Sequence, residues 1–124
     1  MEPLATLHRP IGVFDAGIGS YAAVRLLQER FPDQDLIYLA DRASFPYGGK
    51  DRQALLEVTA QAVQRLQGLG ASAILMASNA PSVTVLDDLR RAASVPLFGV
   101  LPPVAEALAR SKSGHIGVLG CDPW

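Results

Sequence analysis

The sequence contains little of what several classes of protein depend on. Its 124 residues include one cysteine, Cys121, and two histidines that lie far apart in the chain. A single thiol forms no internal disulfide, and isolated histidines form no cluster of metal ligands, so no metal site is expected. Lysine and arginine together number 11, against 12 aspartates and glutamates, and no basic run occurs. This balance argues against a nucleic-acid partner and against binding to a membrane surface.

Long hydrophobic runs are also missing. The apolar stretches are far shorter than a membrane span requires. The N-terminal segment MEPLATLHRP lacks the charged-then-apolar layout of a signal peptide. Together with the lone cysteine, these features predict a cytoplasmic protein. Hydrophobic residues nevertheless make up 49% of the chain, enough for a core, and we expect residues 1–124 to form a single domain.

Short apolar runs alternate with segments of helical periodicity along the whole chain. Strands are predicted at 11–14, 35–40, 72–77, 95–100 and 115–120, and helices at 21–31, 51–69, 82–93 and 103–110. Near-continuous apolar strands joined by helices are typical of a parallel sheet covered on both faces. The predicted fold is therefore α/β, a three-layer sandwich with a mainly parallel sheet flanked by helices.

Local signals define the ends of these elements. Pro32 ends the first helix, in which Ala23, Leu26, Leu27 and Arg30 recur at helical spacings. Asp51 caps the second helix and Gly70 stops it. No helix follows the strand predicted at 115–120 to cover it. An uncovered sheet favours association, so a homodimer is one expectation.

In such a sheet, ligands bind beyond the carboxyl ends of the strands, which directs attention to three loops. The first loop, DAGIGS at 15–20, turns at two glycines and leads into a helix N-terminus suited to a carboxylate or phosphate. The second loop, DRASFPYGGK at 41–50, combines a stiffening proline, a tyrosine hydroxyl, two glycines and the cation of Lys50. The third loop, SNAPS at 78–82, follows the third strand. Plain structural interpretations exist as well: surface turns for the first two loops, and helix capping by Ser78 or Asn79 for the third.

The first loop also matches a dinucleotide-binding pattern. Gly17, Gly19 and Ala22 satisfy G-x-G-x-x-A, and Asp41 lies near where a ribose-binding acid belongs. Asp15 argues against this interpretation, because its charge would lie close to an incoming pyrophosphate. A dinucleotide-binding domain is therefore kept only as an alternative.

Taken together, the segments FDAGIGS, YLADRASFPYGGK and LMASNAPS resemble the N-terminal half of the glutamate racemase family, within the aspartate/glutamate racemase superfamily. That family has an Asp-Ser-Gly-x-Gly-Gly loop, a Pro-Tyr-Gly loop and a Cys-Asn-Thr turn in the same order. The later segments PLFGVLPPVAEAL and SGHIGVLG resemble its continuation, so the resemblance covers 10–120. It implies the first α/β lobe of a cofactor-independent enzyme that interconverts L- and D-glutamate for peptidoglycan precursor supply.

The resemblance also implies a mechanism and a set of site residues. Two cysteines face each other across Cα of the substrate, one removing its weakly acidic proton and the other returning a proton to the opposite face. By position, Asp15 matches the aspartate that assists the first cysteine, and Asn79 matches the substrate-binding asparagine. Pro46, Tyr47 and Gly48 match the loop that contacts substrate. The implied ligand is a small amino acid or dicarboxylate.

Four positions depart from the family pattern. Ser78 stands where the first catalytic cysteine is expected. Ala16 and Ala80 replace a serine and a threonine that contact substrate, and Ser20 replaces the last glycine of the first loop. A serine hydroxyl is a far poorer base than a thiolate, and Asp15 alone does not activate a serine as a histidine would.

The family's second cysteine lies in a Gly-Cys-Thr-His motif well beyond residue 124, and Cys121, followed by Asp-Pro-Trp, does not match it. The sequence therefore predicts a truncated or degenerate member of the glutamate racemase family that is inactive as this chain. The alternatives are a module that binds small carboxylates or another protein and, with less support, the dinucleotide-binding domain.

Overall fold

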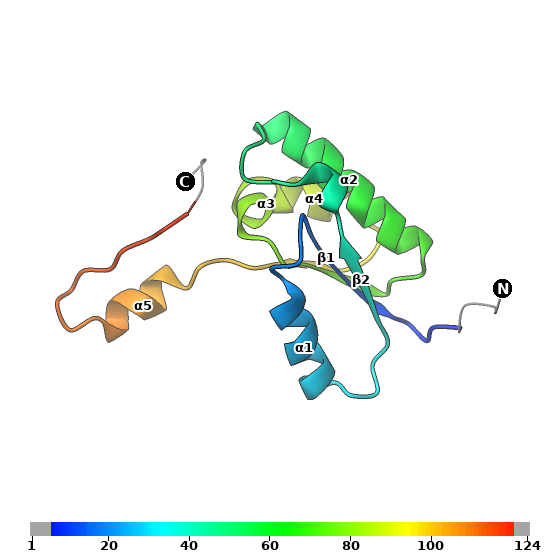
Figure 1. Ribbon diagram of the computed structural model, residues 1–124, viewed down its shortest axis with the longest axis horizontal. Helices are drawn as coiled ribbons and strands as arrows, with labels where there is room; N and C mark the ends of the chain where they lie inside the picture. The colour runs from blue at the N-terminus through cyan, green and yellow to red at the C-terminus, as the bar shows by residue number, and fades with distance from the viewer. Residues whose placement is uncertain (1–5, 121–124) are drawn as a thin grey trace.

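Four strands form one parallel sheet in the computed structural model, which describes residues 6–120 (Figure 1). They are β1 (Ile11–Asp15), β2 (Leu36–Ala40), β3 (Ala73–Met76) and β4 (Leu97–Gly99). Their order across the sheet is β2-β1-β3-β4. Val13 lies opposite both Tyr38 and Leu75, and Leu75 lies opposite Phe98. Because all the pairings are parallel, the carboxyl ends of these strands lie at one edge of the sheet.

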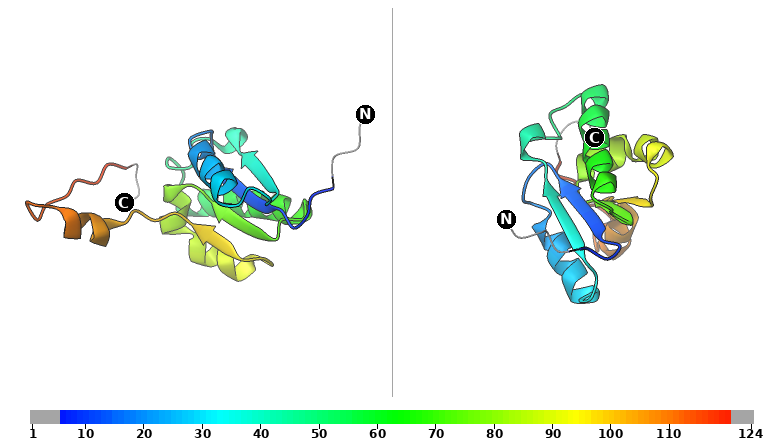
Figure 2. Two further views of the ribbon diagram at one scale, coloured as in Figure 1. Left: turned by 90° about the horizontal axis from the view of Figure 1, so that it is seen from below. Right: turned by 90° about the vertical axis from the view of Figure 1, so that its right-hand side faces the viewer.

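Helices connect the strands and flank the sheet (Figure 2). They are α1 (Tyr21–Arg30), the 3-10 helix η1 (Arg42–Ser44), α2 (Arg52–Gly68), α3 (Asn79–Thr84), α4 (Leu86–Ala92) and α5 (Val104–Arg110). Helix α1 lies on one side of the sheet, and α2, α3 and α4 lie together on the other (Figure 1). The predicted fold class, a parallel α/β sheet flanked by helices, is confirmed.

The main core lies between the sheet and helix α2. Phe14, Ile74 and Met76 of the strands are fully buried and cluster with Leu55 and Leu66 of α2. Burying an apolar side chain of this size contributes about 1.5–3 kcal/mol relative to leaving it exposed. These contacts make the α2 side of the sheet the rigid support for the loops at its carboxyl edge.

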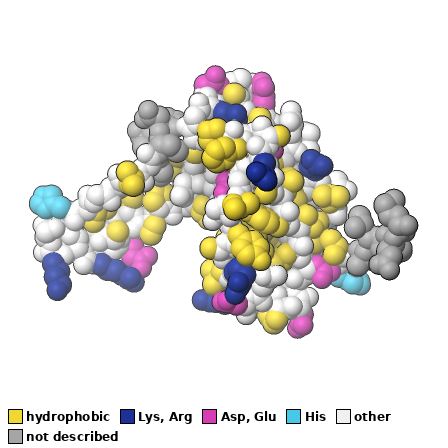
Figure 3. All heavy atoms as spheres, in the orientation of Figure 1, with side chains coloured by type: hydrophobic (Ala, Val, Ile, Leu, Met, Phe, Trp, Pro, Cys, Tyr) yellow, Lys and Arg dark blue, Asp and Glu magenta, His cyan; other side chains and the backbone are white. Residues whose placement is uncertain are grey.

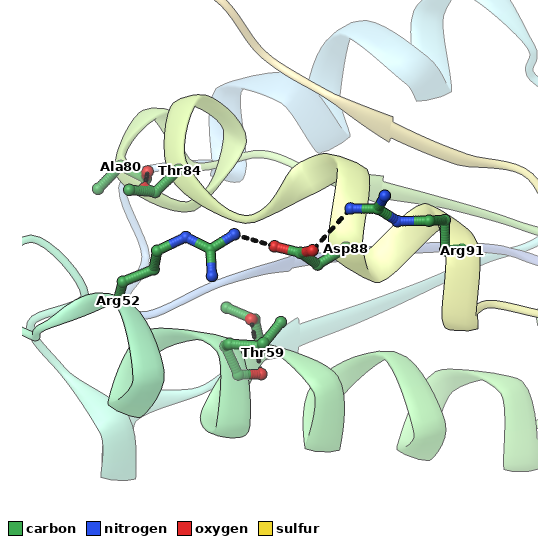
Figure 4. Close-up of polar contacts among 7 residues, drawn as sticks. Arg52, Thr59, Ala80, Thr84, Asp88 and Arg91 are labelled. Carbon is green, nitrogen blue, oxygen red and sulfur yellow. Dashed lines mark hydrogen bonds and ion pairs between the residues drawn. The ribbon is translucent and has the colours of Figure 1, made fainter.

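Polar contacts fix the start of α2 and its position against α4. The Asp51 carboxylate accepts a 2.8 Å hydrogen bond from the N–H of Ala54, as expected of a helix cap. Asp88 of α4 pairs with Arg52 of α2 and also, at 2.7 Å, with Arg91 of α4 (Figure 4). Ion pairs this exposed are worth less than about 1 kcal/mol each, so apolar packing holds the two helices together and the ion pairs orient them.

The buried face of α1 is narrow. Val24 is its buried residue. Of the residues noted for their helical spacing, Ala23 and Leu27 are half-buried, whereas Leu26 and Arg30 are exposed. The inner stripe is therefore centred on Val24. Helix α1 covers only part of its side of the sheet, so a narrow stripe is enough.

The helix predicted at 82–93 begins earlier and is divided in two. Helix α3 starts at Asn79, and the helical conformation is interrupted at Val85 before α4. Val85 has φ −128° and ψ 3°, outside the α-helical range. Its side chain is 1% exposed. Packing of Val85 into the core thus outweighs the continuity of the helix.

The prediction of a fifth strand at 115–120 is wrong. These residues are exposed and have no regular secondary structure. They belong to an arm, residues 101–120, that leaves the sheet and includes α5, a helix with no buried residue (Figures 1 and 2). A strand needs hydrogen-bond partners on a neighbouring strand, and the arm runs away from β4 instead of alongside it.

Candidate active site

The three loops singled out in the sequence meet at the carboxyl edge of the sheet. They line one cavity of about 560 Å³. The lining comprises residues 15–19, 45–48 and 77–80. Every residue predicted for the site belongs to it: Asp15, Ala16, Pro46, Tyr47, Gly48, Ser78, Asn79 and Ala80. The structure thus brings the predicted residues together, while their chemical roles stay predictions.

Asp15 ends β1 and gives the cavity its charge. Its Oδ1 accepts a 2.7 Å hydrogen bond from the N–H of Ala16. Its carbonyl accepts another, also 2.7 Å, from the N–H of Asp41 at the end of β2. Among the lining residues, Asp15 alone has a charged side chain. A cavity with one carboxylate and no lysine or arginine in its lining favours a cationic group, such as an ammonium, beside that carboxylate.

Tyr47 of the second loop is buried and uses its hydroxyl within the protein. Its Oη donates a 2.9 Å hydrogen bond to Oδ2 of Asp41. Burial raises the pKa of the Tyr47 phenol, and the Asp41 hydrogen bond and the charges of Asp41 and Asp15 raise it further. The phenol therefore stays protonated and anchors the loop. The tyrosine hydroxyl that the sequence offered to a ligand already has a protein partner.

The third loop connects β3 to α3. The N–H of Ala77 donates to the carbonyl of Phe14 at 2.9 Å, which ties this loop to the end of β1. Ser78 occupies the N-cap position of α3, as the capping interpretation expects, but its side chain forms no capping hydrogen bond. Ser82 Oγ donates to the Ser78 carbonyl at 2.6 Å and fixes the turn.

A smaller cavity of about 360 Å³ adjoins the first and shares four of its lining residues. Arg42 of η1 lines this second cavity together with Phe45. Lys50, the cation predicted for the second loop, lines neither cavity. The structure therefore places Arg42, and not Lys50, at the side of the site.

Three contributors to the site were not predicted in these roles. Ile18 and Phe45 are exposed apolar side chains that line both cavities. The sequence signal that could have identified them is a large apolar residue close to the glycines of a loop. Asp41 was assigned to the ribose of a dinucleotide, but its carboxylate accepts the Tyr47 hydroxyl. The acid that the dinucleotide alternative assigns to a ribose thus has one of its carboxylate oxygens bonded within the second loop.

Residues 6–120 hold neither a candidate metal site nor a helix that could span a membrane. No group of three or more histidine, cysteine, aspartate or glutamate side chains in this range is placed to hold a metal ion. None of the described helices is long and apolar enough to cross a membrane. Cys121, the single cysteine, lies outside the described residues.

Comparisons of the sequence with known proteins point to one family. Residues 21–124 match the family model described as Asp/Glu/hydantoin racemase. The glutamate racemase of Deinococcus radiodurans is 41% identical over 118 residues, which cover 95% of this chain and 41% of that protein. The glutamate racemase of Roseiflexus is 40% identical over 112 residues, which cover 90% of this chain and 41% of that protein. The chain thus spans less than half the length of these relatives.

Solved structures show the same relationship. The glutamate racemase from Aquifex pyrophilus aligns with a TM-score of 0.77 and 33% identity, over 83% of this chain and 41% of that one. The glutamate racemase from Francisella tularensis, solved in complex with D-glutamate, aligns with a TM-score of 0.70 and 34% identity, over 82% of this chain and 38% of that one. The parallel sheet and its flanking helices therefore match those of glutamate racemase structures.

Proposed function

The chain belongs to the Asp/Glu/hydantoin racemase family, and on this premise we propose that its cavity binds a small amino-acid dicarboxylate such as glutamate without racemising it. The observation that carries the proposal is the lining itself, in which Asp15, Asn79 and three loop backbones surround one cavity of about 560 Å³. This volume is within the usual range for small-molecule sites, roughly 300–1,000 Å³. A relative, the Francisella tularensis enzyme, was solved with D-glutamate.

Each group of such a ligand has a chemically suited partner in the lining. The Asp15 carboxylate suits the ammonium of an amino acid, because opposite charges attract most strongly where water is partly excluded. The Asn79 amide and backbone N–H groups suit the carboxylates, since both present fixed donors. The hydrogen bond from Tyr47 to Asp41 holds the second loop in place for this contact.

Ser78 is the reason to propose binding without turnover. Abstraction of a Cα proton needs a base whose pKa is near the operating pH, and a thiol with a pKa of about 8.5 meets this need far better than an alcohol. Asp15 is the charged group of the lining, and no histidine belongs to the lining to activate the Ser78 hydroxyl. The cavity is therefore proposed to keep a binding function and to lack the first acid/base group.

Removing the charge of Asp15 tests the binding proposal. The parent chain is expected to bind glutamate more tightly than glutarate, which has both carboxylates but no ammonium. The variant Asp15→Asn is expected to bind glutamate roughly 10- to 100-fold more weakly, because it loses a charge-assisted hydrogen bond. Its affinity for glutarate should stay within about twofold. Isothermal titration calorimetry with both ligands measures the two affinities.

The matched control is Asp33→Asn, which changes the net charge equally at an exposed residue outside the cavity lining. Its affinities should equal those of the parent. If Asp15→Asn weakens glutamate and glutarate to the same extent, Asp15 acts by shaping the first loop and does not bind the ammonium. If the parent chain binds neither ligand, the proposed function is wrong.

A separate observation supports association with a second copy of the chain. The arm of residues 101–120 exposes apolar side chains: Leu101, Val104, Leu108, Ile116, Val118 and Leu119. Hydrophobic side chains recur along the arm and gather on the adjoining face of the body (Figure 3). A seven-residue helix such as α5 is too short to be stable alone in water. We propose that these side chains pack against a second copy.

The association proposal predicts a concentration-dependent dimer. Leu108→Glu on α5 is expected to weaken dimerisation at least about tenfold, because it places a charge where an apolar side chain would be buried. Leu26→Glu on α1 is the control, since Leu26 is also exposed, at 54%, but lies outside the arm. Sedimentation equilibrium over a range of concentrations measures both. A parent chain that stays monomeric throughout would contradict the proposal.

A further inference from the structure

Tyr38 contacts the first loop from outside the cavity lining. It lies on β2, at the position that pairs with Val13 of β1. Its hydroxyl is 3.1 Å from the Gly17 carbonyl oxygen and 3.1 Å from Ser20 Oγ. Gly17 is a cavity-lining residue and Ser20 is not. One tyrosine hydroxyl therefore connects the part of the loop that lines the cavity to the part that begins α1.

Proton counting fixes the direction of these hydrogen bonds. A phenol has one O–H, and the Gly17 carbonyl can only accept, so Tyr38 donates to Gly17. The contact between Ser20 and Tyr38 must then run the other way, with Ser20 as the donor. Ser20 is 6% exposed, and a buried hydroxyl needs a partner. The result is a relay in which Ser20 donates to Tyr38 and Tyr38 donates to Gly17.

The relay uses Ser20 in an unusual way. Ser20 occupies the N-cap position of α1, where a serine side chain ordinarily accepts a hydrogen bond from the helix backbone. It forms no such capping bond here, and its hydroxyl contacts Tyr38 instead. Ser20 also stands where the family pattern has glycine, which has no hydroxyl to donate. Ser20 therefore adds a hydrogen bond that a glycine at this position could not form.

The hydrogen bond from Tyr38 to the Gly17 carbonyl also fixes the direction of the next N–H, that of Ile18. The carbonyl of Gly17 and the N–H of Ile18 belong to one planar trans peptide unit and point in opposite directions. With the carbonyl bound to Tyr38, the N–H of Ile18 points away from Tyr38. Ile18 lines the cavity. A donor whose direction is fixed in advance binds an anionic group without first reorganising.

We propose that Tyr38, held by Ser20, is a positioning residue that fixes the first loop in the conformation in which it binds ligand. The claim about ligand affinity rests on the proposed function, whereas the claim about the loop does not. Tyr38→Phe tests it, because this variant loses the hydroxyl but keeps the ring, whose centroid lies 6.1 Å from that of Tyr21. Amide hydrogen exchange in residues 16–21 is expected to become roughly 3- to 10-fold faster. Glutamate affinity is expected to fall by a similar factor.

Four further variants sharpen the test. Ser20→Ala should reproduce the effect of Tyr38→Phe, and Ser20→Thr, which keeps a hydroxyl, should restore most of the parent behaviour. The double variant Tyr38→Phe/Ser20→Ala should be little worse than Tyr38→Phe alone, because both changes break one relay. Tyr21→Phe, at an exposed neighbouring ring, is the control and should leave loop exchange and affinity unchanged.

The outcomes separate the relay from the proposed function. Unchanged exchange in residues 16–21 of Tyr38→Phe would overturn the positioning role. Equal acceleration of exchange across the whole chain would overturn it too, since that pattern reports general destabilisation. Faster exchange confined to the loop supports the relay even if the parent chain binds no glutamate, and in that case only the proposed function fails.

Discussion

The chain is expected to leave L-glutamate optically unchanged. Incubated at high concentration in buffered D2O, it should convert L-glutamate to D-glutamate at a rate about a million-fold or more below that of an active glutamate racemase in the same assay. The proposed reason is Ser78, which supplies an alcohol at the position where the resemblance to the family implies a catalytic thiol. Chiral chromatography of the recovered glutamate measures the conversion.

Ser78→Cys is expected to restore one half of the reaction only. A thiolate at this position can remove the Cα proton of bound glutamate, leave a carbanion, and return a deuteron from solvent to the same face. Exchange at Cα with retention of configuration is therefore expected for one enantiomer, with no racemisation, because the residues that line the cavity include no second thiol and no imidazole. NMR detects the loss of the Cα proton, and chiral chromatography shows that configuration is retained.

The controls for this experiment are the parent chain and Ser78→Ala, neither of which should exchange the Cα proton of either enantiomer. Racemisation by the parent chain well above the no-protein background would contradict the proposal that the chain binds without turnover. Exchange of both enantiomers by Ser78→Cys would show that a second acid/base group reaches the substrate, and would contradict the one-sided arrangement proposed here.

The sequence predicted the fold class because each strand is a short apolar run and each helix has its own period and end signals. Asp51 illustrates this, since it lies next in the sequence to the helix that it caps. The buried face of α1 was less predictable, because Leu26 and Val24 are both apolar and only the sheet decides which of them is covered. Residues 115–120 were predicted as a strand because they form a short apolar run, but a strand also requires a neighbouring strand, which no local pattern reports.

The position of the site was predictable because it follows from the fold class. Once the strands are parallel, their carboxyl ends share one edge, and the loops that follow β1, β2 and β3 must meet there. The side-chain contacts that organise the loops were not predictable. Tyr47 bonds to Asp41 within the second loop, and Tyr38 reaches Gly17 across 21 positions of the chain. These pairs follow from strand register and loop conformation, which residue spacing does not specify.

Gly99→Val is expected to destabilise the chain by about 3 kcal/mol. Gly99 is the last residue of β4. A Cβ at this position would lie 2.7 Å from Ser82 Oγ and 2.8 Å from Leu86 Cδ2. Both neighbours are buried in α3 and α4, so neither can move without cost, and overpacking of this kind costs typically 1–3 kcal/mol. Urea denaturation measures the free energy of unfolding.

Gly99→Val is also expected to weaken glutamate binding at the cavity, an effect that a general loss of packing would not explain. Ser82 Oγ accepts from the N–H of Val100 at 3.0 Å and donates to the Ser78 carbonyl at 2.6 Å. Displacing Ser82 therefore moves the turn that carries Ser78, and glutamate affinity should fall together with stability. Gly68→Ala is the control, because a Cβ there meets nothing within 4 Å, and alanine in a helix stabilises by about 0.5–1 kcal/mol over glycine. Equal stability of Gly99→Val and the parent would show that α3 can shift away from β4, and that the Ser78 turn is not held by this packing.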